Sequence, residues 1–497
     1  MQRQPATDFP ADASGAVIPL HLVLATAAKV LCSAVFLTGR DLEEARRHSG
    51  PHALFVHHLD DVLLDLISID VDREERTLTV SVPLDPPTVD RIVAGYRAYY
   101  EDLDADWAAE TERLVALGSV SRSARFLGDQ GSVILPLDDR PLGFTPVPVR
   151  TTLPDAAGQD WPMGDRLGSD TASSAVDRQA IADAIDRAFE DPEAYTAGVV
   201  VLHGGRIVGE RYREGFDKDT QLESWSMGKS LTATLIGVLI QQGHLSLDEP
   251  APIPEWQQPG DPRGEIRVAD LLQMSGGLLF SGQDDPRQRW EYGVPDHLYI
   301  YSEAVDAFRW ATDRPAEYPP GTVGRYRNCD PLTLGYIVKR IVTERLGQNY
   351  LQWPQAALFD RIGIRRQVLE TDWYGNFLLT GFDYGTARNW ARLGQLYLQD
   401  GMWQGDRVLP EGWSRFVSTP APGWEEPKYG GQFWLNRIGE FELPEDAYFA
   451  AGYGDQRTFV VPSADLVVVR LGHRSNTDVP KDATNAMLRE LMKVVGG

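Results

Sequence analysis

The pattern of hydrophobic and polar residues changes character several times along the chain. In the first part it combines helical periodicity with short alternating runs, without any grouping of catalytic residue types. We therefore expect residues 1–145 to form an additional N-terminal α+β region of unknown role. The elements predicted there are a helix over 20–30 that continues into a strand over 31–37, a hairpin formed by 66–70 and 77–82, and helical structure within 85–117.

The next stretch, residues 146–175, is rich in residues that break regular structure. It has four prolines between positions 146 and 162, followed by the small polar run GSDTASS at 168–174. Proline lacks a backbone donor and fixes φ, and clusters of small polar residues favour loops. This composition predicts a linker.

From residue 176 onwards, strand patterns occur near both ends of a long segment, with helical patterns between them. This arrangement predicts a single antiparallel sheet built from the two ends of the domain, flanked by helices and joined to a helical subdomain. The overall class is therefore α/β in the α+β sense, and residues 176–497 form the second domain. The predicted elements are a helix over 177–190, a hairpin of 197–202 and 206–212, a helix over 226–242, mainly helical structure over 265–418, strands at 432–435, 457–461 and 466–470, and a helix over 481–495.

Composition and charge exclude several classes of partner. The net charge of −24 opposes binding to nucleic acid and to anionic membranes, both of which need basic patches. We find no membrane-spanning run and no export signal in the sequence, so we expect a cytoplasmic protein. The two cysteines, Cys32 and Cys329, fit buried free thiols, although a single bridge between them stays open. Nothing in the sequence indicates a cofactor or a metal site.

The segment SWSMGKS at 224–230, followed by an apolar helical run, carries the main chemical signal. Ser226 and Lys229 are three residues apart, so they share one face of the predicted helix. A serine hydroxyl is a weak nucleophile that needs a nearby base, and a buried lysine with a lowered pKa can be that base. The same pattern also fits an N-cap serine followed by a solvated lysine.

A second candidate element is Tyr326-Arg-Asn328, which precedes a predicted helix. A tyrosine can relay a proton from the serine to the leaving group if cations hold part of its population as phenolate. The asparagine amide can orient a substrate carbonyl or the lysine. Tyr374-Gly-Asn376 has the same form, but we prefer Tyr326 because Gly321-Thr322 leads into it and a helix follows.

The third element is AGYGDQ at 451–456, which leads into a predicted strand. Glycines allow a backbone to approach a ligand closely, so a main-chain N–H here could pair with that of Ser226 as an oxyanion hole. An ordinary turn before a strand fits the same letters.

Taken together, the three segments resemble the serine β-lactamase/penicillin-binding-protein superfamily on its class C side, which includes family VIII carboxylesterases and 6-aminohexanoate-dimer hydrolases. The resemblance implies a β-lactamase/transpeptidase-like fold and a serine hydrolase activity with Ser226 as the acylated nucleophile. It implies Lys229 as the base partner, Tyr326 as the catalytic tyrosine and Asn328 as the asparagine of the tyrosine-x-asparagine motif. It also implies an oxyanion hole made by the amides of Ser226 and Tyr453. The stretches at 235–250, 268–278, 385–394 and 401–413 agree as well, so the resemblance covers about residues 176–497.

Two features bear on the substrate. β-Lactamases carry Lys-Thr-Gly on the strand of the third motif, whereas this chain has YFAAG at 448–452, without a cation. Arg457 is near, but its direction depends on the strand register. The third motif has the G-x-x-x-Q form of the 6-aminohexanoate-dimer hydrolases, and Tyr292 in the run WEYG is a candidate substrate-closing residue.

The sequence therefore predicts a serine hydrolase that cleaves carboxylic esters or linear amides through an acyl-enzyme, in the manner of 6-aminohexanoate-oligomer hydrolases or esterases. A β-lactamase or a D-amino-acid peptidase is the alternative, and a binding module without catalysis is a third class. The expected partner is a small ester or amide substrate. A transacylase and a homodimer also stay open.

Overall fold

The structure is a computed structural model that describes residues 17–49, 60–99, 105–168, 176–282, 294–473 and 477–496. The chain forms two compact units, and neither is a continuous segment. Two stretches from the second half of the sequence belong to the first unit. Unit 1 comprises Met1–Pro146, Phe280–Arg314 and Glu370–Asn376, and unit 2 comprises Val147–Leu279, Pro315–Leu369 and Phe377–Gly497.

Unit 1 is built around a four-stranded antiparallel sheet that helix α1 covers. The predicted hairpin is confirmed, because β1 pairs with β2 in the register Asp72↔Thr77. The predicted strand over 31–37 is wrong: α1 continues to Phe36. The helix is buried on every side from Leu22 to Val35. In such a segment, hydrophobic periodicity does not separate a strand from a helix. The elements are α1 (Leu20–Phe36), α2 (Leu42–His48), α4 (Asp60–Leu66), β1 (Ser68–Asp72), β2 (Thr77–Pro83), α5 (Pro86–Tyr99), α6 (Trp107–Leu117), β3 (Ser119–Phe126), β4 (Ser132–Ile134), α10 (Asp296–Ser302) and α11 (Ala307–Thr312).

Buried ion pairs tie the late segments of the chain into unit 1. Lys29 Nζ lies 2.8 Å from Glu370 Oε2, and Glu370 Oε1 accepts a hydrogen bond of 2.8 Å from the Ser132 amide. Arg122 and Glu303 form a second, bidentate pair with bonds of 2.8 and 2.9 Å. Buried charges are costly unless they are paired, so these contacts specify where the two segments attach.

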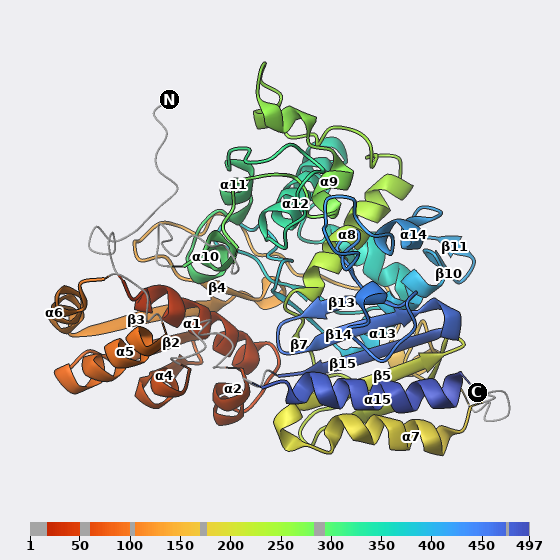
Figure 1. The fold of residues 1–497 in the computed structure, drawn as a ribbon, viewed down its shortest axis with the longest axis horizontal. Helices are drawn as coiled ribbons and strands as arrows, with labels where there is room; N and C mark the ends of the chain where they lie inside the picture. The colour runs from red at the N-terminus through yellow and green to blue at the C-terminus, as the bar shows by residue number, and fades with distance from the viewer. Residues whose placement is uncertain are drawn as a thin grey trace. The chain divides into compact units, whose positions relative to one another are not determined.

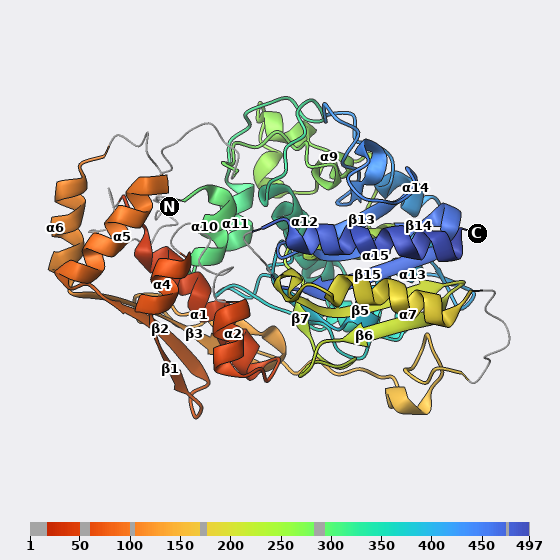
Figure 2. The same cartoon turned by 60° about the horizontal axis from the view of Figure 1, so that its bottom comes forward.

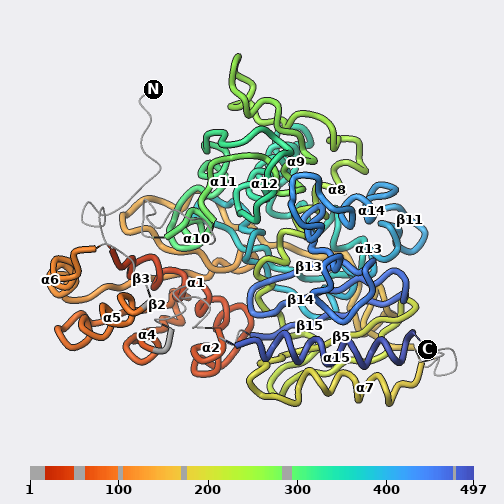
Figure 3. Tube along the Cα trace, in the orientation of Figure 1, coloured from red at the N-terminus to blue at the C-terminus, as the bar shows by residue number. Residues whose placement is uncertain are grey.

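Unit 2 contains the six-stranded antiparallel sheet that the sequence predicts from the two ends of the domain. Strand β15 pairs with β5, which precedes it by more than 250 residues, and Figure 3 shows these two segments side by side. The strand order is β12-β13-β14-β15-β5-β6. The strands are β5 (Thr196–His203), β6 (Arg206–Tyr212), β12 (Trp434–Leu435), β13 (Tyr448–Gly452), β14 (Gln456–Val461) and β15 (Leu466–Gly472).

Helices cover both faces of this sheet. Helices α7 and α15 lie together along one face, as Figures 1 and 2 show, and pack on an apolar layer that includes Phe449, Phe459 and Val468. Helices α8 and α13 pack on the other face. The helices of unit 2 are α7 (Arg178–Asp186), α8 (Met227–Gln241), α9 (Val268–Leu272), α12 (Cys329–Arg340), α13 (Ala387–Leu398), α14 (Trp413–Val417) and α15 (Val479–Val495). The predicted terminal helices of this domain are confirmed.

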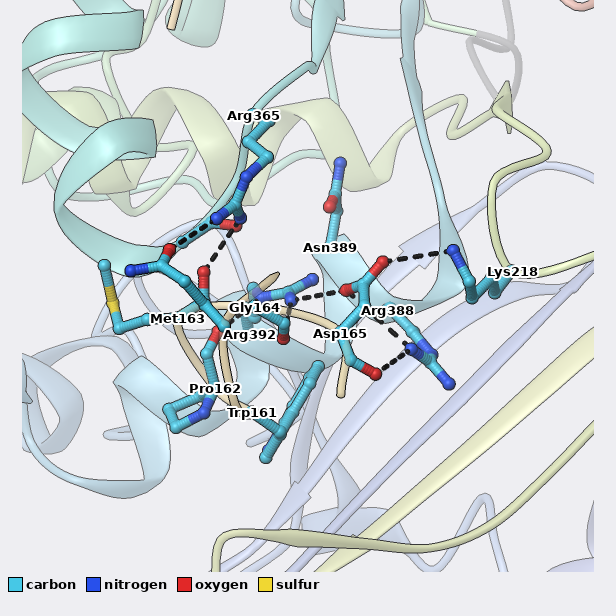
Figure 4. A network of polar contacts seen from close by, with 12 residues as sticks. Trp161, Pro162, Met163, Gly164, Asp165, Lys218, Arg365, Arg388, Asn389 and Arg392 are labelled. Carbon is cyan, nitrogen blue, oxygen red and sulfur yellow. Dashed lines mark hydrogen bonds and ion pairs between the residues drawn. The ribbon is translucent and has the colours of Figure 1, made fainter. Parts of the chain in front are cut away.

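The first described part of the predicted linker, residues 147–168, belongs to unit 2, and Figure 4 shows Trp161 to Asp165 against Arg388 and Arg392. Asp165 accepts a 2.8 Å hydrogen bond from Arg392 and lies 3.7 Å from Arg388. Arg392 also donates to the carbonyls of Pro162 and Gly164 at 2.8 and 2.7 Å. Both arginines belong to α13, so this helix holds the segment through charged side chains that are almost fully buried.

Replacing Asp165 with asparagine is expected to lower the free energy of unfolding of unit 2 by about 3–5 kcal/mol, because a nearly buried arginine loses its counter-charge. Lys218 also pairs with Asp165, at 3.3 Å, but it is exposed. Lys218→Gln is therefore the matched control, with a change below about 1 kcal/mol. Urea unfolding at pH 7 measures both, and equal losses would contradict the assigned roles.

The pH dependence of this pair has a definite sign. Burial by itself would raise the pKa of Asp165, but the hydrogen bond and charge of Arg392, together with Arg388, bring it below its ordinary value of 3.8. The folded state therefore releases this proton more readily than the unfolded state. The contribution of Asp165 is present above about pH 4 and is lost as the pH falls below that value.

The sequence also predicts buried cysteines and no membrane-spanning helix. Neither Cys32 nor Cys329 forms a disulfide, both are buried, and burial raises the pKa of the Cys32 thiol to about 12. Among the described residues, no helix combines the length and the apolar character needed to cross a membrane.

Candidate active site

Ser226 stands at the start of α8, as predicted. It is the N-cap residue of the helix, and it is partly exposed although residues Met227 to Leu239 are all buried. The amides of the first helical turn have no partners within the helix, and the positive end of the helix dipole lies there. The Ser226 hydroxyl is thus accessible at a position that favours negative charge.

Lys229 lies one turn further along α8 and contacts the serine directly. Its Nζ is 2.9 Å from Ser226 Oγ and donates a 2.6 Å hydrogen bond to the carbonyl oxygen of Thr380. Only 1% of Lys229 is exposed, and burial holds the pKa of its amine well below the usual value of 10.5. Within the described part of the chain, no carboxylate forms an ion pair with it. The alternative of a solvated first-turn lysine is therefore wrong.

Tyr326 completes a compact group with these two residues. Its ring centroid lies 4.9 Å from Lys229 Nζ, and its hydroxyl forms a hydrogen bond with the Ser226 side chain. Burial raises the pKa of Tyr326 above 10, and the bond to Ser226 and the charge of Arg457 offset only part of that rise. The sequence made a phenolate conditional on nearby cations, and burial disfavours the cationic form of the adjacent Lys229 amine.

Aromatic side chains hold the Tyr326 ring. Its centroid lies 5.2 Å from that of Trp434 and 5.9 Å from that of Tyr429, and Trp424 stacks on Tyr429 at 4.7 Å. Contacts at such distances stabilise a fixed ring orientation. Trp434 and Trp424 are partly exposed, so aromatic surface is accessible beside the Tyr326 ring.

The third motif lies next to the serine turn. Tyr453 is in the turn between β13 and β14, and its ring meets the edge of the Trp225 ring at 5.6 Å. The preceding residue must be glycine, because a Cβ at Gly452 would lie 2.0 Å from the Ser224 carbonyl oxygen. The glycine therefore permits the close approach that brings the Tyr453 turn beside Ser226.

The remaining predicted site residues are Asn328 and Tyr292, and the competing motif is Tyr374-Gly-Asn376. Asn328 is fully buried at the N-cap of α12, two residues after Tyr326. Its contact with a substrate stays a prediction. Tyr292 lies outside the described residues. The competing motif is in unit 1, where the Asn376 amide donates to Asp306 and Asp372 at 2.8 and 2.9 Å.

Sequence reasoning missed the segment 379–383, which wraps around the start of α8. The Thr380 carbonyl accepts a hydrogen bond from the Lys229 amine. The Asp383 carboxylate accepts one from the Ser224 hydroxyl, and the Asp383 carbonyl accepts one of 2.9 Å from the Ser224 amide. The pairing of β7 (Leu222–Glu223) with β9 (Asp383–Gly385) brings the two segments together. No sequence signal could reveal Thr380, since a backbone carbonyl is common to every residue.

The strand register settles the direction of Arg457. It pairs opposite Ala451, and its guanidinium lies over the rings of Phe441 and Phe449, on the face that α7 and α15 cover. It also forms an ion pair of 2.9 Å with Asp455. Because α8 packs on the opposite face, the Arg457 guanidinium points away from the face that carries Ser226, and its charge acts on the site through its effect on the pKa of Tyr326. Among the described residues, no cluster of three metal-ligating side chains occurs.

Comparison with known proteins agrees with this geometry. Residues 181–491 match the model of the family described as Beta-lactamase. A 6-aminohexanoate-dimer hydrolase from Paenarthrobacter ureafaciens is 25% identical over 309 residues, which cover 58% of this chain and 74% of that protein. The protein described here belongs to the beta-lactamase family, and it is a hydrolase of this fold.

Solved structures confirm the fold. A putative 6-aminohexanoate-dimer hydrolase from Bacillus anthracis superposes with a TM-score of 0.50 at 21% identity, covering 62% of this chain and 84% of that one. A putative beta-lactamase from Bacteroides dorei superposes with a TM-score of 0.50 at 16% identity, covering 65% of this chain and 100% of that one. The predicted β-lactamase/transpeptidase-like fold is thus confirmed.

Proposed function

We propose that this protein is a serine hydrolase that cleaves carboxylic ester or linear amide bonds through an acyl-enzyme on Ser226. One observation carries the proposal: a buried lysine amine with a lowered pKa lies 2.9 Å from a partly exposed serine oxygen at a helix start. A nucleophile within hydrogen-bond reach of a base is the arrangement that acyl transfer requires.

In the first step, the neutral Lys229 amine takes the proton of Ser226 while Oγ attacks the substrate carbonyl carbon. The carbonyl π electrons move to its oxygen, which becomes an oxyanion. The Thr380 carbonyl orients the amine by accepting a hydrogen bond from one of its N–H groups, so the nitrogen lone pair can face Ser226. The backbone N–H groups of Ser226 and Tyr453 are the proposed donors to the oxyanion.

In the second step, the carbonyl re-forms and the bond to the leaving group breaks. Tyr326 gives its proton to the leaving alkoxide or amine and recovers one from Lys229, which returns to neutral. The raised pKa keeps Tyr326 protonated, and its proton can pass to the departing alkoxide or amide nitrogen, which is the stronger base. Water then attacks the acyl-enzyme with the same groups in reversed roles and releases the carboxylic acid.

The surroundings of the serine support neutral or amine-bearing substrates over β-lactams. Trp424 and Trp434 around Tyr326 are partly exposed, the Arg457 guanidinium packs on the other face of the sheet, and the protein carries a net charge of −24. A β-lactam bears a carboxylate beside its ring. A charge-assisted hydrogen bond to such a group is worth about 1.5–3 kcal/mol, or roughly ten- to a hundredfold in rate.

We expect nitrophenyl butyrate and an aminohexanoyl amide to be turned over at least tenfold more efficiently than a chromogenic cephalosporin. The reason is the missing cation on strand β13. The measurement is kcat/KM for the three compounds in one buffer. A cephalosporin value above both others would reject the proposal in favour of a β-lactamase or a D-amino-acid peptidase.

A further inference from the structure

Trp225, the residue before Ser226, has an uncommon backbone conformation. Its φ is +50°, and only 3% of the residue is exposed. A bulky side chain rarely adopts a positive φ, because its Cβ crowds the backbone. Such a conformation persists only where the surrounding structure holds it in place. Whatever holds Trp225 therefore also sets the direction in which the chain enters Ser226.

The Trp225 ring is held between two other aromatic rings. Its centroid lies 5.4 Å from that of Phe382 and 5.6 Å from that of Tyr453, whose ring it meets edge-on. Tilted and edge-on contacts at these distances are favourable. Phe382 follows Thr380 by two residues, and the Thr380 carbonyl holds the Lys229 amine. The Trp225 indole therefore contacts both Phe382, in the segment that holds Lys229, and Tyr453, in the turn of the third motif.

The backbone on the other side of Trp225 is fixed by the same two segments. The Ser224 amide donates to the Asp383 carbonyl at 2.9 Å, and the Ser224 hydroxyl donates to the Asp383 carboxylate. The carbonyl of Ser224 lies against Gly452, where no Cβ would fit. The chain is therefore clamped directly before the nucleophile, with the Trp225 ring in the middle of the clamp.

We propose that Trp225 is a positioning residue of the hydrolytic reaction, which keeps the backbone N–H groups of Ser226 and Tyr453 aimed at one point. This inference rests on the proposed function. Oxyanion donors act only when they lie within about 2.7–3.1 Å of the oxyanion, so a small displacement of the Tyr453 turn would remove one of two donors. Trp225 itself does not touch the substrate.

The test compares Trp225→Gly with Trp225→Phe. Glycine adopts a positive φ without strain but removes the ring, whereas phenylalanine keeps an aromatic ring between Phe382 and Tyr453. We expect Trp225→Gly to lower kcat about a hundredfold, the usual effect of losing one oxyanion donor, with KM within about threefold. Trp225→Phe should recover most of kcat. Full activity in Trp225→Gly would overturn the proposal.

A second readout reports the oxyanion site without turnover. Phenylboronic acid adds to a serine Oγ to form a tetrahedral anionic adduct, while the serine proton passes to the adjacent base. Its inhibition constant should rise about a hundredfold in Trp225→Gly and little in Trp225→Phe. A merely structural role would not move this constant separately from KM, so an unchanged constant would also overturn the proposal.

If Trp225→Gly does not fold, the Tyr453→Ala variant tests the same inference. This variant keeps the backbone N–H and removes the ring that meets Trp225, and residue 453 lies in a partly exposed turn. A comparable loss of kcat and of boronate affinity is expected, and wild-type behaviour would reject the inference. A wild-type enzyme that neither hydrolyses the ester nor binds the boronate would instead refute the proposed function itself.

Discussion

Ser226→Ala is expected to reduce ester turnover by at least about 10⁴-fold and to abolish covalent labelling. The physical reason is that the alanine variant has no nucleophile at the helix start, and removal of a nucleophilic serine leaves only the residual effect of binding and of the oxyanion site. A fluorophosphonate probe should add once per chain to the wild-type protein. Mass spectrometry of the digested adduct should locate it on the peptide that contains Ser226.

Ser230→Ala provides a matched control for this experiment. Ser230 lies one turn further along α8 and is buried, and its hydroxyl donates a 2.7 Å hydrogen bond to the Gln432 carbonyl. Its loss removes a neighbouring serine of the same helix without removing the proposed nucleophile. Stoichiometric labelling of Ser226→Ala, or the loss of labelling in Ser230→Ala alone, would show that the nucleophile is assigned to the wrong residue.

Lys229→Met and Tyr326→Phe are each expected to lower kcat at least about a hundredfold, the scale of general acid–base contributions. The two residues and Ser226 contact one another, so the double variant should lose much less than the product of the single effects. Tyr374→Phe is the control, because that tyrosine lies in unit 1. An equal loss in Tyr374→Phe would overturn the choice of Tyr326.

The pH dependence separates a catalytic lysine from a structural one. Burial lowers the pKa of Lys229, so the amine is an effective base only above that pKa, and kcat/KM should fall on the acid side as the amine takes up a proton. In the unfolded chain the lysine keeps its ordinary pKa and binds more protons. Stability therefore rises with pH between the folded and unfolded pKa values, and the burial of this amine costs free energy at pH 7.

Lys229→Met should consequently stabilise the protein at pH 7 while it removes activity. Thermal unfolding and kinetics of the same sample measure both effects. A variant that loses stability together with activity would indicate that Lys229 mainly holds the fold. An activity profile without an acid limb would contradict its role as the base.

Much of unit 2 could be predicted from residue patterns. The six-stranded sheet from the two ends of the domain follows from alternating or β-branched runs such as those of β5 and β15, because a strand with buried side chains has a short-range signature. The spacing of Ser226 and Lys229 predicts that they share a helix face, and the structure brings their side chains to 2.9 Å. Helix geometry alone determines that neighbourhood.

The features of the fold and of the site that the sequence patterns could not predict depend on long-range contacts. Arg457 could face either side until the register of β13 and β14 placed it opposite Ala451. Tyr326 and Tyr374 both begin a tyrosine-x-asparagine motif. The flanking residues favoured Tyr326, and the fold places it beside Lys229 and places Tyr374 in unit 1. The segment 31–37 has the composition of a buried strand, and tertiary packing against the unit 1 sheet made it the end of a helix.

The sequence by itself determined that Ser226 and Lys229 share one helix face and that strands near both ends of the domain build one sheet, because these depend on residue type and on spacings of a few positions. Only the tertiary structure decided the burial that shifts the pKa values of Lys229 and Tyr326, the contact of Lys229 with the Thr380 carbonyl and the packing around Trp225. Burial sets the two pKa values, and burial is a property of the whole packed unit. The carbonyl and the clamp depend on chain segments more than 150 residues apart, whose meeting no local pattern encodes.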